Sequence, residues 1–118
     1  MLNLRIPALL FALTVSTTGC HSAYVEATVA NRSNQTISLV EVDYPSASFG
    51  TQSLAPGQDF HYRFKVLGSG PMKLIYTDPA HHEQTSDGPS LNEGIEGPIT
   101  ITITPTGTQW HPAFTTKP

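Results

Sequence analysis

Apolar side chains recur at every second position through much of this chain. The clearest run is Ile99, Ile101 and Ile103, which alternate with threonines. An α-helix would turn these isoleucines in different directions, whereas a β-strand places all three on one face. The same alternation occurs in residues 25–29 and 60–66. The pattern therefore predicts a chain built from β-strands, each with one buried face.

Turn-forming residues separate these runs. The chain contains 9 Gly and 10 Pro, and only 13% of its residues are charged, so the composition is poor in the residues that sustain long helices. Strand-like runs follow one another at intervals of about ten residues, a spacing typical of sandwiches. We expect an all-β fold, an antiparallel β-sandwich of about six to eight short strands that follows an N-terminal signal helix.

Three local patterns refine this expectation. The apolar positions change face between Ile37 and Val40, which predicts either a β-bulge near Leu39 or a strand covered on both sides. The run from Gly68 to Gly70 has the length of a hairpin turn between two strands. Residues 87–98 contain several Gly and Pro and are expected to form a surface loop.

The order of these segments resembles immunoglobulin-like and fibronectin-III-like modules of exported bacterial proteins. The resemblance rests on the alternating run 25–29, the stretch Leu54 to Gly57, and the aromatic strand 60–66 that follows it. The cysteine pair and central tryptophan of true immunoglobulin domains are missing, since Trp110 lies near the end. The resemblance implies a two-layer sandwich and no particular function.

The N-terminal segment has the layout of an export signal. Arg5 is the one charged residue before Glu26, and the ten residues 6–15 are mostly apolar, too few to span a bilayer as a helix. Small residues occupy positions 16–19, and Cys20, the single cysteine, follows them. This arrangement resembles the lipobox of a bacterial lipoprotein.

That resemblance implies how the chain is divided and where it resides. Residues 1–19 would be a removed signal peptide, residues 20–23 a lipidated N-terminus (acylated at Cys20) with a short tether, and residues 24–118 a single β-sandwich domain. The protein would be lipid-anchored in the bacterial cell envelope, at the outer membrane or on the periplasmic side of the inner membrane. Lipoboxes usually have Leu three residues before the cysteine, where this chain has Thr17. Cleavage by signal peptidase I without lipidation therefore stays an alternative.

The expected partners are the membrane, reached through the N-terminal lipid, and an unknown envelope protein. The formal net charge is −3 and the Lys and Arg residues are scattered. Binding of nucleic acid requires clustered cations that neutralise phosphates, so nucleic acid is not an expected partner.

One segment holds a dense group of potential metal ligands. His81, His82 and Glu83 are consecutive, and His61 on another strand is a further candidate. Imidazole and carboxylate suit zinc or copper, but a structural site requires about four ligands. Neighbouring strand residues also point to opposite faces. We expect an exposed polar turn and no metal or other cofactor, with a periplasmic metal or small-ligand binding protein as the alternative.

The sequence offers no recognisable catalytic motif, and we expect a non-catalytic structural or protein-interaction module. No serine lies in a Gly-x-Ser-x-Gly elbow. Trp110 and Phe114 are candidate binding residues, because an exposed aromatic in a polar tail can anchor a partner. Alternatively, Trp110 belongs to the last strand and covers the core.

Overall fold

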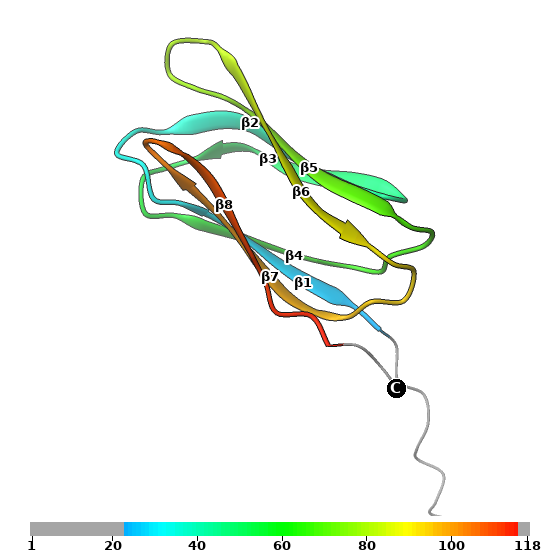
Figure 1. Ribbon diagram of the computed structural model, residues 1–118. Helices are drawn as coiled ribbons and strands as arrows, with labels where there is room; N and C mark the ends of the chain where they lie inside the picture. Colours follow the sequence, from blue (N-terminus) through cyan, green and yellow to red (C-terminus); the bar gives the residue numbers. More distant parts are fainter. Residues whose placement is uncertain (1–22, 116–118) are drawn as a thin grey trace, which may run out of the picture.

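The computed structural model describes residues 23–115, which form two stacked β-sheets (Figure 1). The strands are β1 (Val25–Asn31), β2 (Ile37–Tyr44), β3 (Ala47–Leu54), β4 (Asp59–Phe64), β5 (Gly70–Thr77), β6 (Glu83–Leu91), β7 (Gly97–Thr104) and β8 (Gly107–Pro112). One sheet has the order β4-β1-β7-β8 and the other β3-β2-β5-β6. The predicted β-sandwich is thus confirmed, while the signal segment and Cys20 lie outside the described residues.

The sheets are antiparallel except at one position. β1 and β7 run parallel, with Val25 opposite Gly97 and Asn31 opposite Ile103. The remaining neighbours pair in antiparallel fashion, as β1 does with β4. Alternation along a strand shows which side chains are buried but not the direction of the neighbouring strand, so the sequence did not reveal this parallel pair.

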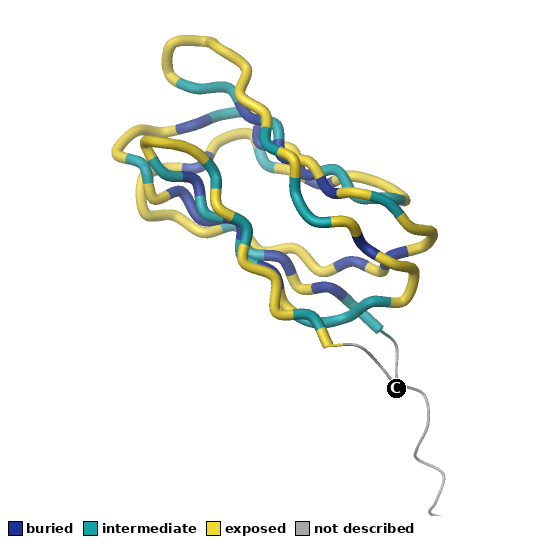
Figure 2. The backbone as a smooth tube through the Cα atoms, in the orientation of Figure 1, coloured by how far each residue is buried: buried dark blue, intermediate teal, exposed yellow. Residues whose placement is uncertain are grey.

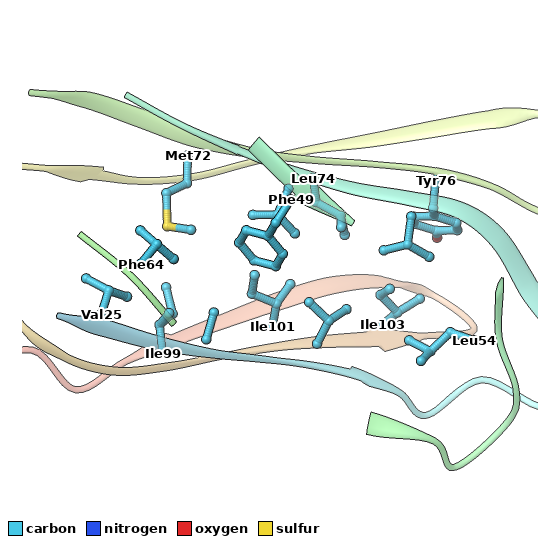
Figure 3. Packing of buried hydrophobic residues seen from close by; sticks show 14 of the residues in the cluster. Val25, Phe49, Leu54, Phe64, Met72, Leu74, Tyr76, Ile99, Ile101 and Ile103 are labelled. Carbon is cyan, nitrogen blue, oxygen red and sulfur yellow. The ribbon is translucent and has the colours of Figure 1, made fainter. Parts of the chain in front are cut away.

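The core lies between the two sheets, where the inward-facing apolar side chains meet (Figures 2 and 3). The isoleucines of β7 are at most 1% exposed, and Phe64 on β4 is 4% exposed. The facing sheet contributes Met72, Leu74 and Tyr76 from β5. These residues follow the predicted alternation, which confirms the assignment of faces on β5 and β7.

The predicted bulge lies at Leu39. The pairing of β2 with β5 shifts register between Ser38 and Glu41, and Leu39 has the left-handed φ of 51°. The bulge brings the carbonyl oxygen of Val40 so close to Gly50 on β3 that a Cβ there would collide with it. Glycine at position 50 is therefore what allows β3 to pair with the bulged strand.

Two of the predicted connections were wrong. The segment from Gly68 to Gly70 is not a hairpin turn, because β4 and β5 belong to different sheets and the chain crosses between layers there. Residues 87–98 are not one loop, because β6 continues to Leu91 and β7 begins at Gly97. In both cases turn-forming residues marked a change of direction, but the sequence did not say which strand would become the neighbour.

The connections divide between two poles of the sandwich. At the terminal pole the chain enters β1 and leaves β8: the N–H of Gly97 donates to the carbonyl of Tyr24 at 3.0 Å, and Glu96 pairs with Thr115. At the opposite pole, called here the loop pole, lie the connections 32–36, 55–58, 78–82 and 105–106 (Figure 1). Residues 23–115 include no helix with the length and apolar character needed to cross a membrane.

Candidate functional site

A cleft of about 390 Å³ opens at the loop pole. Three connections wall it: residues 33–35 after β1, residues 78–80 after β5, and residues 104–107 between β7 and β8. The core side chains Tyr76 and Ile103 also line it. Its volume falls within the range of small-molecule sites. The candidate site is therefore made by turns that a shared sandwich holds in place.

Asn31 shapes the first wall of the cleft. Its side chain is fully buried, and its Nδ2 donates to the carbonyls of Gln35 and Leu54, each at 2.9 Å. Its Oδ1 accepts from the N–H and the hydroxyl of Ser33 at 3.0 and 2.6 Å. A buried amide with all these partners fixes the turn after β1 and ties it to the end of β3.

Asp78 organises the second wall. Its Oδ1 accepts hydrogen bonds from the backbone N–H groups of Ala80 and His82, each at 2.9 Å. Its Oδ2 accepts from Nε2 of Gln84 at 3.0 Å. These bonds favour the ionised form, and the one from His82 contributes most to holding the pKa of Asp78 below its usual value. The carboxylate is thus already engaged in stabilising the turn.

Tyr76 adds a hydroxyl to the cleft. Burial raises its pKa above the usual value, and the charge of Asp78 raises it further. The phenol therefore stays neutral at physiological pH and can act as a hydrogen-bond donor. Together with the serine, threonine and amide side chains of the walls, it suits the cleft to hydrogen bonding with a polar, uncharged group.

The candidate metal ligands do not converge. His81 occupies the left-handed position of the turn with a φ of 66°, and both His81 and His82 are exposed. His61 lies in the other sheet, where its Nδ1 is 3.0 Å from Oγ1 of Thr28. Among residues 23–115, no three His, Cys, Asp or Glu side chains are grouped as a metal site requires. Glu83 is exposed and begins β6, directly after the turn that holds both histidines.

Trp110 and Phe114 both pack against the core. Nε1 of Trp110 donates to Oγ of Ser86 on β6 at 2.9 Å, and the indole lies directly over Gly88. β6 and β8 are edge strands of opposite sheets. Trp110 therefore closes this open side of the sandwich instead of projecting from a polar tail.

The other open side, between β3 and β4, carries an aromatic cluster that sequence reasoning described incompletely. Phe49 of β3 stacks on Tyr62 of β4 with ring centroids 4.5 Å apart, and Tyr44 stacks on Phe64 at 3.9 Å. The alternation predicted that the whole aromatic face of residues 60–66 would be buried, yet Tyr62 is 41% exposed. The reason is that β4 is an edge strand, and no signal along the strand itself indicates that.

No protein-family model matches this chain, and no curated protein sequence matches it.

Proposed function

We propose that this chain is a lipid-anchored protein of the bacterial cell envelope that acts without catalysis, as a module that binds another protein. Cys20, the single cysteine, ends a segment with the layout of an export signal. In an oxidising compartment a lone free thiol is a liability, which acylation removes. The lipid would then attach the domain to the membrane through a tether of a few residues.

The separation of the two poles is the observation that carries this proposal. Both ends of the described chain lie at the terminal pole, and the turns 32–36, 78–82 and 105–106 lie at the loop pole (Figure 1). These turns contribute the walls of the cleft. An anchor at Cys20, just ahead of β1, would hold the terminal pole against the membrane. The loop pole and the sides of the sandwich would then face partners in the envelope.

Membrane fractionation and palmitate labelling test the anchor. Cys20→Ser is expected to abolish incorporation of labelled palmitate and to release the protein from the membrane fraction. Thr17→Leu, which restores the usual lipobox residue, is expected to speed processing of the precursor, and Ser16→Ala serves as the neutral control. Labelling that persists in Cys20→Ser would overturn the anchor. If Ser16→Ala lost palmitate labelling to the same extent as Cys20→Ser, the cause would be a general export defect.

A second candidate function is the binding of a small polar ligand at the loop pole. The cleft favours this alternative, since the turn after β5 forms one wall and Tyr76 contributes a neutral hydroxyl. The expected result is that a bound ligand shifts together the amide NMR signals of the non-proline residues in 33–35, 78–80 and 104–107. Shifts confined to one of these turns would contradict a site in the cleft.

A further inference from the structure

β3 presents an unprotected edge. β2 is its one neighbouring strand, so no backbone ladder covers its other side. Near its end, the carbonyl of Leu54 accepts from Asn31 and that of Ser53 from Thr51. Its sequence from Ala47 to Leu54 contains no charged residue and no proline. Natural proteins usually block such edges with charges, proline or a covering element, because an open edge pairs with other chains.

The other three sheet edges carry such protection. β4 carries Asp59 and Arg63 along its length. β6 contains Asp87 and Pro89 and has a register shift against β5. β8 ends in a proline and is bound to β6 through Trp110. The contrast singles out β3 as the edge on which the fold leaves room for an added strand.

Exposed apolar side chains lie on both sides of this edge. Three large apolar side chains are exposed within residues 23–115, namely Leu39 (59%), Tyr62 (41%) and Leu67 (58%). Tyr62 stacks on Phe49 of β3, on the side that faces the opposite sheet. Leu39 borders a shallow hollow together with Gly50 and Gln52 of β3. On one face, a strand added to β3 would therefore cover Tyr62. On the other face, its side chains would lie across β3 from Leu39.

The outer face next to β3 is acidic. Glu41 and Asp43 of β2 lie opposite Gly50 and Ser48 of β3, and they alternate with buried valines, so they face outward. The hydrogen bond and charge of Asp43 raise the pKa of Glu41, and the charge of Glu83 adds to this. Lys73 of β5 lies opposite Asp43 in the sheet register. One lysine beside Glu41 and Asp43 leaves an excess of negative charge near the edge.

These charges decide between two possible occupants. A second copy of this chain paired through β3 would present the same acidic outer face and so offer no complementary charge. A segment with basic side chains on its outer face would be attracted instead. Its other face would be apolar, to cover Tyr62.

We propose that β3 accepts, by strand addition, an extended segment of a partner protein in which apolar and basic residues alternate. Main-chain hydrogen bonds to β3 would supply affinity, and the alternating side chains would supply specificity. The inference rests on the interaction role proposed above and names its surface and partner class. It does not depend on lipidation, so the palmitate experiment and the binding experiment below can fail separately.

A labelled peptide of four Lys-Val repeats is the probe, and its fluorescence anisotropy with the purified full chain is the measurement. We expect saturable binding by this peptide and none by a Glu-Val peptide. N-methylation of every second peptide amide removes the hydrogen-bond donors along one edge of the peptide. We expect this change to abolish binding when that edge is the one that pairs with β3. Hydrogen exchange should show new protection within residues 47–54.

Matched substitutions separate the edge from the rest of the surface. Glu41→Lys is expected to weaken binding by about five- to tenfold, since it replaces attraction with repulsion at an exposed site, while Glu93→Lys at the terminal pole should change it less than about twofold. Tyr62→Ala should weaken binding, whereas Leu67→Ala, which removes an exposed apolar side chain beyond the terminal-pole end of β3, should not. Each of four results would overturn the proposal. The Glu-Val peptide binds as tightly as the Lys-Val peptide, the two variants of either matched pair have equal effects, the Lys-Val peptide does not bind, or sedimentation shows a dimer that forms through β3.

Discussion

Trp110 lies flat against the backbone of Gly88. A Cβ at position 88 would come within 2.5 Å of the indole ring, and Nε1 of Trp110 donates to Ser86 two residues earlier on the same strand. The contact joins β8 of one sheet to β6 of the other, where no backbone ladder connects them. One aromatic side chain thus closes an open side of the sandwich.

Gly88→Ala is expected to destabilise the domain by about 1–3 kcal/mol, because the added methyl group displaces the indole. Ser86→Ala should cost about 1 kcal/mol, since it removes only the hydrogen bond. Urea unfolding measures both changes. Trp110 is the sole tryptophan, so its fluorescence reports directly on the contact, and an unshifted emission maximum in Gly88→Ala would contradict the placement of the ring.

Phe64→Ala is expected to cost about 3–5 kcal/mol, because the ring is 4% exposed and stacks on Tyr44. Its neighbour Arg63 faces outward and contacts the ring of Tyr24 at 4.0 Å. Loss of such an exposed cation–π contact in Arg63→Ala should cost about 0.5–1 kcal/mol. Thermal melting measures the loss of stability in both variants. Similar decreases in melting temperature would mean that the assignment of Phe64 to the inward face of β4 and of Arg63 to its outward face is wrong.

Asn31→Ala is expected to destabilise the domain by about 1–3 kcal/mol, since the buried carbonyl of Leu54 would lose its side-chain donor. Asn34→Ala in the same turn is the control, because Asn34 is exposed and should have an effect below about 0.5 kcal/mol. Urea unfolding of both variants checks this. If the control lost as much stability, the amide network of Asn31 would not be what fixes the turn.

Asp78→Asn is expected to reduce the dependence of stability on pH in the acid range. The pKa of Asp78 is lower in the folded protein than its usual value, so its ionised form favours folding. That contribution is present above the unfolded pKa of about 3.9 and is lost as the pH falls through the lower, folded value. Melting temperatures measured from pH 7 down to pH 2 should fall less steeply in Asp78→Asn than in the wild-type chain. A parallel pair of curves would exclude this carboxylate as the source.

Zinc is expected to leave the melting temperature unchanged. A genuine site would stabilise the folded state by about 2.7 kcal/mol at a hundredfold excess over its Kd. His81 and His82 are exposed. Asp78 lies 3.9 Å from Nδ1 of His82, but its carboxylate already accepts hydrogen bonds within the turn and does not give the buried support that normally orients ligating imidazoles. A zinc-induced rise in melting temperature that disappears when both histidines are replaced by Ala would instead establish a metal site at this turn.

The alternation of Ile99, Ile101 and Ile103 was enough to predict both a strand and its buried face, because side-chain direction in a strand depends only on position along it. The change of inward face from Ile37 to Val40 was visible for the same reason and left two alternatives, a bulge near Leu39 or a strand covered on both sides, of which the structure shows the bulge. The polar turn at His81 was likewise evident from the residues between two strands. Each of these features is local, and local backbone geometry is what a sequence pattern records.

The neighbour of each strand was decided only in three dimensions. Nothing along residues 60–66 indicates that β4 is an edge, so the exposure of Tyr62 could not be predicted. Nor could the sequence predict that the chain crosses between the sheets at Gly68, that β1 pairs in parallel with β7, or that Trp110 packs on Gly88. These features depend on contacts between residues far apart in sequence, and the same alternating pattern is compatible with many strand orders. The strand order that the chain adopts buries all the apolar faces together. This order places the cleft at the loop pole and leaves the edge of β3 open.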